Sequence, residues 1–293
     1  MTNTRNLSEE ALTDAVLASF DGAPSERFRE IARALVSHLH AFIADAAITE
    51  EEWFQGIGFL TRTGHITDDK RQEFILLSDV LGVSMLVIGQ NNRKPVGATE
   101  ATVFGPFFVA GSPAYELGED IANGASGAPC FVQGRILGAD GAPVAGARIE
   151  IWQADDEGLY DLQRSDLDAP QGRGHLFSAP DGAFWFWTVR PEAYPIPSDG
   201  PVGDLLMAAG RGPMRPAHIH FRVEARGYET LTTHVFADGD EFLDSDAVFG
   251  VKTSLIAPFV DHAPGVAPDG RLVAEPFATM EYDLVLARAG ASA

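Results

Sequence analysis

One stretch of strictly alternating residues constrains this chain more than any other. Residues 215–223 read RPAHIHFRV, and the period of two between apolar and polar side chains predicts a β-strand. Its apolar residues would face a core, while His218, His220 and Arg222 would face the other side of the sheet. Two imidazoles two residues apart on one strand face can reach a single metal ion. The strand is therefore a candidate metal site.

Composition limits the kinds of partner that the protein can bind and the cellular compartment that we expect for it. The chain carries 42 acidic and 21 basic residues, a net charge of −21. Such a surface repels phosphate backbones and anionic lipid headgroups, so we expect no nucleic-acid partner and no membrane insertion. The single cysteine, Cys130, excludes an internal disulfide and fits a reducing compartment. No apolar run reaches the roughly 20 residues of a spanning helix, and we predict a cytoplasmic protein.

Helical patterns dominate the first third of the chain. Thr49-Glu50-Glu51-Glu52 is a capping box that predicts a helix start, and apolar residues recur at helical spacing after Pro24-Ser25. A third segment, from about Asp68 to Gly89, is mostly apolar from Phe74 onward, so we expect it to be buried against a second domain, a second subunit or both. We predict an N-terminal helical domain over residues 1–94 that forms a homodimer interface.

Short strand-like runs replace the helical period after Lys94-Pro95. Gly and Pro clusters separate these runs and no helix-sized pattern lies between them, which favours an antiparallel β-sandwich over βαβ units. The predicted strands are 131–137, 147–153, 183–189, 216–225, 231–237 and 280–287. The predicted fold class is α+β and mainly β, with the helical domain followed by an antiparallel β-sandwich catalytic domain over residues 95–293.

Two of the five tyrosines stand in polar or rigid loops. Tyr160 lies in DDEGLYD (155–161) and Tyr194 in PEAYPIP (191–197). A phenol binds metals poorly while it is protonated, but a strongly Lewis-acidic trivalent ion can deprotonate it. Phenolate is a hard anionic oxygen that suits Fe(III) better than Zn(II) or Cu(I). With two imidazoles, two phenolates would hold a ferric ion and leave room for a substrate.

Each of these features also has an ordinary structural explanation. A His-x-His pair occurs in zinc enzymes, in cupins and on plain surface strands. A single tyrosine is commonly packed or hydrogen-bonded. It is the convergence of all four side chains that favours a metal site.

Three motifs carry a resemblance that covers nearly the whole chain: GLYD at 158–161, RPEAYPIPSDGPVGDLL at 190–206 and RPAHIHF at 215–221. The sequence resembles the intradiol ring-cleaving dioxygenases, non-haem ferric enzymes that cut catechols between the two hydroxylated carbons. The resemblance implies a small aromatic diol and O2 as reactants. It also implies one Fe(III) per chain, held by Tyr160, Tyr194, His218 and His220. Family members often hold a phospholipid between the helical domains of a dimer, and this chain permits the same.

The resemblance also assigns roles beyond the metal ligands. Tyr194 would leave the metal and accept a substrate proton, and Arg215 would stabilise charge that develops on the ring. The other interpretation of Arg215 is a surface arginine before a proline. His234 occupies a position where catechol-specific relatives often carry Gln, which indicates a hydrogen-bonding role at the site, although the sequence does not define that role.

Substrate choice depends on a single acidic residue. Asp79 is the only charge in the apolar stretch 74–83, and a buried carboxylate is costly unless it is partnered. It would either form an intramolecular salt bridge or accept a hydrogen bond from a third substrate hydroxyl. Two segments, 103–107 and 244–250, resemble the hydroxyquinol 1,2-dioxygenase branch of the family. In that branch the pocket would be lined by Leu76, Asp79, Val103, Phe104, Gly105, Pro106, Phe107, Ile196, Pro197, Arg215 and Val248.

The resulting hypothesis is intradiol cleavage of hydroxyquinol (1,2,4-trihydroxybenzene) by O2 to 3-hydroxy-cis,cis-muconate, the tautomer of maleylacetate. The main alternative is a catechol or chlorocatechol 1,2-dioxygenase. A zinc-binding β-sandwich module and an interaction protein without catalysis are further alternatives. The sequence does not define the preference among diols, the binding of lipid or the geometry of a dimer.

Overall fold

The structure is a computed structural model, and it describes residues 5–68 and 71–290. The chain divides into two compact units between Arg62 and Thr63, and each unit is considered by itself. The division precedes the domain boundary expected at 94/95, because the two helices in between pack within the second unit. Of the expected domain ranges, residues 1–4, 69–70 and 291–293 lie outside the described residues.

The first unit is helical, as the sequence predicts, and side-chain caps define its helix starts. Ser25 caps α2 by accepting a hydrogen bond from the Phe28 amide at 3.2 Å. The predicted capping box is present, because Thr49 accepts from the Glu52 amide (3.2 Å) and the Glu52 carboxylate accepts from the Thr49 amide (2.9 Å). The helices are α1 (Glu9–Ser19), α2 (Glu26–Asp45) and α3 (Glu50–His65), the last of which continues across the unit boundary.

The apolar segment predicted as one helix from about Asp68 to Gly89 is two helices. They are α4 (Glu73–Val80) and α5 (Val83–Asn91), and their axes differ by 78°. Gly82 causes the break, because it adopts a left-handed φ of 72° that is strained for any other residue. The expected burial holds for one side of α4 only: Val80 is 1% exposed, but Phe74 and Ile75 are 46% and 45% exposed. Helix α5 has no buried residue within the single chain. The apolar exterior of α5 therefore remains uncovered in the single chain.

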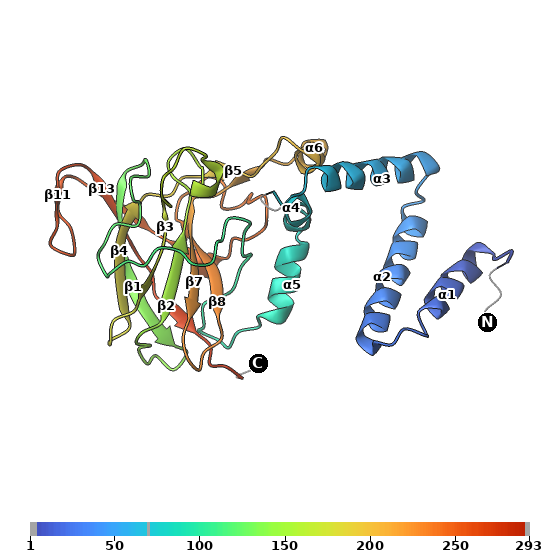
Figure 1. The fold of residues 1–293 in the computed structure, drawn as a ribbon, viewed down its shortest axis with the longest axis horizontal. Helices are drawn as coiled ribbons and strands as arrows, with labels where there is room; N and C mark the ends of the chain where they lie inside the picture. Colours follow the sequence, from blue (N-terminus) through green and yellow to red (C-terminus); the bar gives the residue numbers. More distant parts are fainter. Residues whose placement is uncertain (1–4, 69–70, 291–293) are drawn as a thin grey trace. The chain divides into compact units, whose positions relative to one another are not determined.

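The second unit is built on two sheets (Figure 1). One has the order β10-β13-β1-β14, with β4 also paired to β1, and the other has the order β3-β2-β7-β8-β9. Their bounds are β1 (Pro129–Gly138), β2 (Arg148–Trp152), β3 (Arg173–Phe177), β4 (Ala183–Val189), β7 (His218–Glu224), β8 (Leu231–Ala237), β9 (Ile256–Ala257), β10 (Phe259–His262), β13 (Phe277–Glu281) and β14 (Leu284–Leu286). Shorter elements complete the unit: β5 (Tyr194–Pro195), β6 (Met214–Arg215), β11 (Gly265–Val266), β12 (Leu272–Val273), α6 (Pro201–Ala208), and the 3₁₀ turns Asp161–Gln163 and Thr253–Leu255.

The sandwich is mainly antiparallel, with parallel exceptions that the sequence did not indicate. Among the described strands, β13 and β14 run parallel to β1, and β9 runs parallel to β8. The predicted strand 280–287 is in fact the end of β13 followed by β14, and Asp283 between them accepts a hydrogen bond from the Arg135 amide of β1 at 2.8 Å. Strand β3 was missed because its sequence RGHLF has only two large apolar residues, Leu176 and Phe177, which are adjacent and show no alternation.

The alternation in β7 separates the core from the face that carries polar residues. Ile219, Phe221 and Val223 lie in the central apolar cluster between the sheets, as predicted. His218 and His220 point to the opposite face, where the segments that carry Gly105, Tyr160 and Tyr194 lie against them. The sheet thus presents both imidazoles in one buried layer outside the core.

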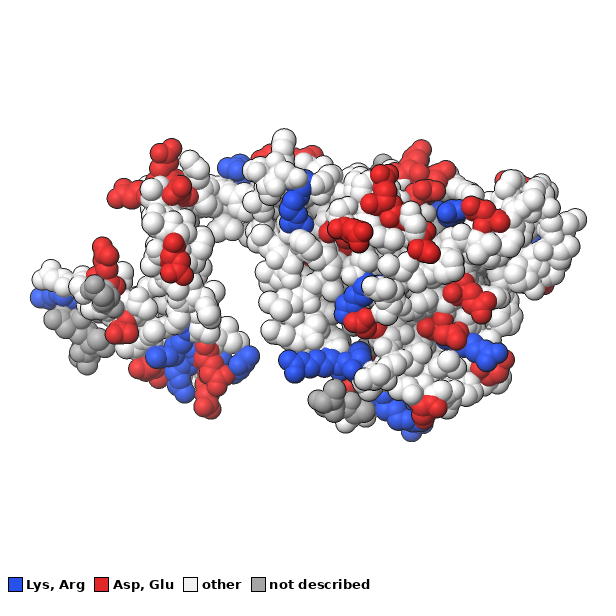
Figure 2. Space-filling view, turned by 180° about the vertical axis from the view of Figure 1, so that it is seen from behind, with Lys and Arg blue, Asp and Glu red and all other residues white. Residues whose placement is uncertain are grey.

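Helix hydropathy and the distribution of surface charge describe the exterior of the chain. No single described helix is long and apolar enough to cross a membrane, although the bent pair α4 and α5 together meets that length and composition. On the face seen in Figure 2, acidic side chains are widely spread, and basic side chains mostly lie beside acidic ones. This distribution agrees with the net charge of −21.

Candidate active site

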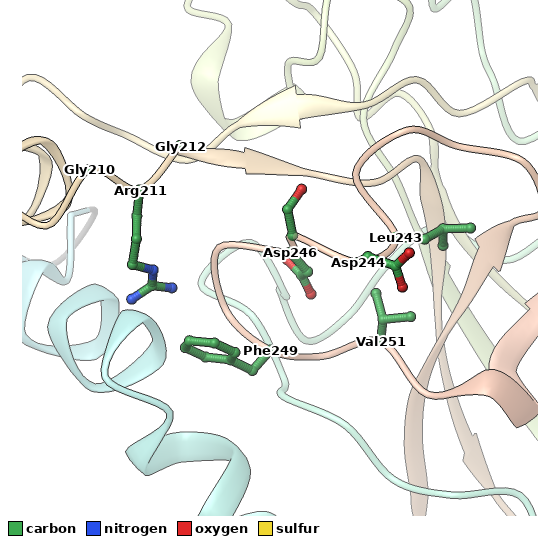
Figure 3. Close-up of a pocket in the computed structure, with 9 residues that line it drawn as sticks. Gly210, Arg211, Gly212, Leu243, Asp244, Asp246, Phe249 and Val251 are labelled. Carbon is green, nitrogen blue, oxygen red and sulfur yellow. The ribbon is translucent and has the colours of Figure 1, made fainter.

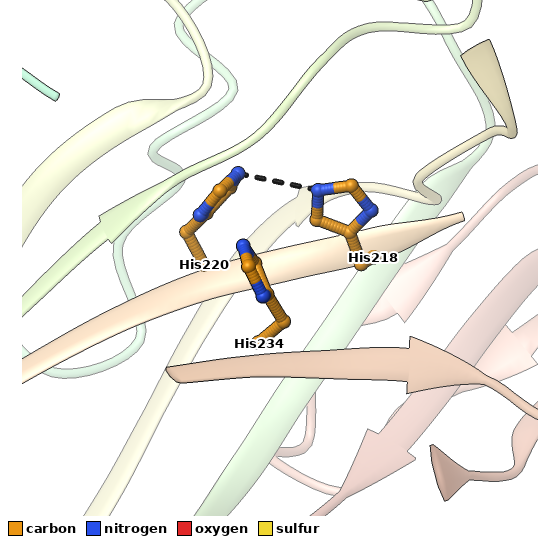
Figure 4. Close-up of side chains that lie close together, drawn as sticks. All are labelled: His218, His220 and His234. Atoms are coloured by element: carbon orange, nitrogen blue, oxygen red, sulfur yellow. Dashed lines mark hydrogen bonds between the residues drawn. The ribbon is translucent and has the colours of Figure 1, made fainter. Parts of the chain in front are cut away.

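Three histidines from two neighbouring strands meet on the outer face of the β7–β8 pair. His220 of β7 stands opposite His234 of β8 in the antiparallel register. Each of these two residues and His218 offers a ring nitrogen within 4.8 Å of the others, and all three side chains are buried. Figure 4 shows His218 and His220 facing each other, with their Nε2 atoms 3.2 Å apart.

Two tyrosines reach the same point from loops. Tyr160 precedes the 3₁₀ turn at Asp161–Gln163, and its amide donates to the Gln163 side chain at 2.9 Å. Tyr194 lies in β5 and packs directly against Gly158, where a Cβ would be 2.6 Å from the Tyr194 Cβ. Glycine at position 158 is therefore required for the two loops to approach this closely.

The four side chains predicted as metal ligands are brought together by this arrangement. The Tyr160 hydroxyl lies 3.1 Å from the Tyr194 hydroxyl and 2.9 Å from His220 Nε2. Their donor atoms thus form one connected cluster, although two come from the sheet and two from loops. All four residues are at most 5% exposed.

Burial fixes the charge of these groups in the absence of a cation. Burial raises the pKa of Tyr160 well above its ordinary value, and the neighbouring Tyr194 raises it further. Burial lowers the pKa of His218 to about 3, with Arg215 contributing, and lowers those of His220 and His234 well below the ordinary value. The imidazoles are therefore neutral and offer lone pairs, while ionisation of the Tyr160 phenol would require a bound cation. This donor set fits a trivalent metal ion.

A hydrogen bond defines which nitrogen of His218 carries the hydrogen. His218 Nδ1 lies 2.6 Å from the Pro216 carbonyl oxygen, which can only accept, so Nδ1 donates and Nε2 keeps its lone pair. His234 Nδ1 lies 2.6 Å from the Thr102 hydroxyl, which donates to Nδ1 in one tautomer of His234 and accepts from it in the other. His234 Nε2 is buried and has no protein partner among the described residues, so it can bond a group bound in the site.

A buried ion pair adjoins the histidines. Arg215 is 3% exposed, its Nε lies 3.1 Å from Asp246 Oδ1, and its Nη1 lies 3.3 Å from His218 Nε2. Asp246 also accepts from the Gly250 amide at 2.8 Å. Burial alone would raise the pKa of Asp246, but Arg215 outweighs burial and the pKa is lowered. Arg215 is therefore a buried cation with a paired charge, and not a surface residue.

A cavity of about 480 Å³ opens next to this cluster, at the side of α4 and the loop after β5. Six of the predicted pocket residues line it: Leu76, Asp79, Pro106, Phe107, Ile196 and Pro197. The remaining predicted residues are not among those that line it. Gly105 adjoins the His220 ring, Phe104 lies 6.0 Å from Trp152 between ring centroids, and Val103 and Val248 share an apolar cluster with Leu76.

Comparison with known proteins agrees with this geometry. Residues 103–288 match the profile of the family described as dioxygenase, and residues 25–99 match that described as catechol dioxygenase N terminus. The chain is 54% identical to a hydroxyquinol 1,2-dioxygenase of Nocardioides simplex over 96% of both chains. It is 59% identical to a 6-chlorohydroxyquinol 1,2-dioxygenase of Cupriavidus pinatubonensis over 87% of this chain and 92% of the relative. The chain belongs to the intradiol dioxygenases.

Structural similarity extends over the same range. A crystal structure of hydroxyquinol 1,2-dioxygenase from Pseudomonas putida DLL-E4 superposes with a TM-score of 0.90 at 46% identity, covering 96% of this chain and 98% of that one. The two profile matches meet near residue 100, close to the boundary expected from the sequence, whereas the compact units of this dioxygenase divide at 62/63. The helices α4 and α5 thus belong to the N-terminal sequence family but pack within the catalytic unit.

Asp79 is buried in the wall of the dioxygenase pocket. It is 5% exposed, and no described basic residue lies within ion-pair distance of it, so the salt bridge considered from the sequence is not formed. Burial raises the pKa of Asp79, while the Ser84 hydroxyl and the charge of Arg215 lower it by less. An acid in this setting is available to hydrogen-bond a polar group in the cavity.

Several site residues escaped the sequence analysis. Thr102 is hydrogen-bonded to His234, from which it is 132 positions away in the chain. Asp246 pairs with Arg215, from which it is 31 positions away. Trp152 stacks on the His220 ring at 4.6 Å. Strand alternation at β2 places Trp152 on the same face as Glu150, and this signal could have assigned it to the layer of His220.

Replacing Asp79 by Asn should stabilise the protein at neutral pH. Because the folded-state pKa of Asp79 is raised, folding favours the protonated acid, and this stability is lost as the pH rises through the raised value. Below about pH 4 the wild-type residue is neutral as well, so the difference should vanish there. Thermal unfolding of both proteins from pH 4 to 8 measures the difference.

The matched control is Asp140→Asn. Asp140 is an exposed carboxylate whose pKa is lowered by its hydrogen bond with Arg288. Its replacement should therefore leave stability at pH 8 unchanged or slightly reduced. If the stability of Asp79→Asn relative to the wild-type protein is no greater at pH 8 than at pH 4, this would contradict the burial of a charged group at this position.

Proposed function

We propose that this dioxygenase cleaves hydroxyquinol with O2, between the two adjacent hydroxylated carbons, to give 3-hydroxy-cis,cis-muconate. The observation that carries the proposal is the buried carboxyl of Asp79 in the wall of the pocket, which forms no ion pair with a described basic residue. Burying an acid is costly unless hydrogen bonds satisfy its oxygens, and a third substrate hydroxyl would add a hydrogen bond to the one from the Ser84 hydroxyl. The names of the two relatives, which act on hydroxyquinol and its chlorinated form, support the same substrate class.

We infer that the cofactor is one non-haem Fe(III), held by Tyr160, Tyr194, His218 and His220. The support is chemical: two neutral imidazoles and two phenols meet in a buried cluster, and phenolate oxygen favours a hard trivalent ion. When bound, ferric iron supplies the Lewis acidity that ionises the diol and activates its ring towards O2. The alternative is the set of three histidines, whose ring nitrogens lie within 4.8 Å of one another, but that set lacks the phenolate oxygens that suit a hard trivalent ion.

The surrounding residues have distinct roles in this proposal. Tyr194 Oη accepts a proton from a substrate hydroxyl. The Arg215 guanidinium stabilises negative charge on the ring, and Asp246 keeps it oriented through the 3.1 Å contact. His234 donates a hydrogen bond from Nε2 into the same space. Pro106, Phe107, Ile196 and Pro197 form apolar walls that exclude water from the reacting carbons.

Iron content should distinguish the metal ligands His218 and His220 from His234, which is proposed as a hydrogen-bond donor. His218→Gln and His220→Gln should lose most of the iron, because each removes a lone pair from the cluster. His234→Gln should retain about one iron per chain with the visible absorption of the wild-type protein, since the amide can still donate a hydrogen bond. Iron analysis and absorption spectra of the purified proteins measure this. Loss of iron in His234→Gln comparable to that in His218→Gln would make His234 a ligand instead.

Oxygen uptake by the iron-loaded protein, with hydroxyquinol and catechol side by side, tests the substrate. We expect hydroxyquinol to be preferred, and Asp79→Leu to lower its kcat/KM by roughly 10- to 100-fold, the usual effect of losing a hydrogen bond to a charged or buried group. Catechol turnover by the same variant is the internal control and should change little. Equal loss with both diols would reject the selective role of Asp79, and no uptake with either would reject the proposed activity.

We also propose that the chain forms a homodimer through its N-terminal helices and that a phospholipid can bind there. The support is the apolar exterior of α2 and α3 within the chain: Phe28, Leu35 and Phe54 are 56%, 57% and 64% exposed. Contiguous apolar side chains of this kind mark interaction surfaces. Native mass spectrometry should give twice the chain mass, and Leu35→Glu with Phe54→Glu should give monomers. A wild-type monomer would reject the dimer, and a dimer without added lipid mass would reject the lipid.

A further inference from the structure

Arg211 joins two segments that are distant in the chain, the end of α4 and the loop of residues 243–251. It follows α6 in the sequence Gly210-Arg211-Gly212, and Figure 3 shows its side chain directed towards Phe249, between the helices and the loop of residues 243–251. Its Nη1 donates to the Val80 carbonyl at 2.6 Å, and its Nη2 donates to the Ala247 carbonyl at 2.9 Å. The two carbonyls lie 131 and 36 residues away in the chain.

The first contact holds the end of α4. Val80 is the last residue of this helix, so its carbonyl oxygen accepts no hydrogen bond from within the helix. A cation at a helix C-terminus is also favourable, because it interacts with the helix dipole. The preceding residue is Asp79, the acid proposed to recognise the third hydroxyl. The position of this helix end therefore sets the position of the Asp79 carboxyl in the pocket.

The second contact holds the loop that supports Arg215. Ala247 follows Asp246, whose carboxylate holds the Arg215 guanidinium at 3.1 Å. The loop meets α4 in one apolar cluster, in which Ala247 and Val248 pack with Leu76 and Val80. Arg211 thus spans from the backbone beside Asp79 to the backbone beside Asp246.

A strained residue completes the arrangement. Phe249 has a left-handed φ of 58°, which is unfavourable for an aromatic residue. The Arg211 guanidinium stacks over its ring at 4.5 Å, and the ring lies against Gly82, where a Cβ would be 3.6 Å from it. Strain of this kind persists where the surrounding contacts require one conformation. Phe249 and Arg211 together close the gap between the bend after α4 and the loop.

We propose that Arg211 is a positioning residue for substrate selection, which fixes the Asp79 carboxyl relative to the Arg215–Asp246 pair. It does so through the Val80 and Ala247 carbonyls and touches neither substrate nor metal. The inference rests on the proposed function, because it assigns to Arg211 the geometry in which hydroxyquinol is distinguished from catechol. Asp79 then recognises the third hydroxyl while Arg215 acts on the ring, at a separation that Arg211 holds constant.

Two substitutions and a matched control test the proposal in the full-length, iron-loaded protein. Arg211→Met keeps the aliphatic stem but removes both hydrogen bonds, and Arg211→Lys can reach only one of the two carbonyls. The control is Arg271→Met, because Arg271 likewise donates to a backbone carbonyl, that of Gly118 at 2.9 Å, and stacks over an aromatic ring, that of Trp187 at 4.8 Å. Arg271 has no contact with the residues of the site.

Arg211→Met should lower the ratio of kcat/KM for hydroxyquinol to that for catechol by about 5- to 10-fold, mainly through a higher KM for hydroxyquinol. Arg211→Lys should restore part of this ratio, and Arg271→Met should leave it unchanged. Iron content and visible absorption should be the same in all four proteins, since no variant alters a ligand. An unchanged ratio in Arg211→Met, or an equal fall in Arg271→Met, would overturn the proposal.

Hydrogen exchange separates failure of this inference from failure of the proposed function. In Arg211→Met the amides of 79–84 and 246–250 should exchange faster than in the wild-type protein, while β1 and β13 should not change. Unchanged exchange in both segments would overturn the positioning role, whatever the substrate is. If the wild-type protein does not turn over hydroxyquinol but Arg211→Met still shows this local change in exchange, the substrate is rejected. Arg211 then remains the link between the two segments.

Discussion

The mutual dependence of four buried polar side chains constrains the rest of this structure. Tyr194, Tyr160, His220 and His218 form, in that order, a chain of contacts at hydrogen-bonding distance, and they are almost without solvent contact. Such a cluster is costly to bury unless a shared partner satisfies it. The sheet supplies two rigid positions, and the loops ending in Tyr160 and Tyr194 must fold onto them. Trp152 and Phe107 then cover the cluster by stacking on the His220 and Tyr160 rings, at 4.6 and 4.4 Å between centroids.

Local periodicity accounts for what the sequence could predict. The alternation in β7 assigned Ile219 to the core and His218 to the site face because side chains of a strand necessarily alternate. The capping box at Thr49 located the start of α3 because its hydrogen bonds span only three residues. The sandwich followed from short strands with turns between them. The meeting of the tyrosines with the histidines came from motif resemblance, because no local pattern determines how two loops fold onto a sheet.

Features that depend on partners distant in the chain could not be predicted. The left-handed φ of Gly82 that breaks the helix was not predicted, and the exposed surface of α5 gives no local sign that distinguishes it from a buried helix. The parallel pairing of β13 and β14 with β1 joins residues about 150 positions apart, as Gln133 and Glu281 show. Thr102 was overlooked for the same reason, since a threonine has no distinctive signal until the imidazole beside it is known.

Charge balance links substrate recognition to the metal cluster. Arg215 is the one cation that contacts the histidines within the described residues, and Asp246 neutralises it at 3.1 Å. Asp246, and not Asp79, forms the ion pair with Arg215, and burial raises the pKa of Asp79 more than the charge of Arg215 lowers it. Asp79 is thus left to accept a hydrogen bond from a substrate hydroxyl while Asp246 keeps Arg215 oriented. Selection and chemistry can therefore share one pocket.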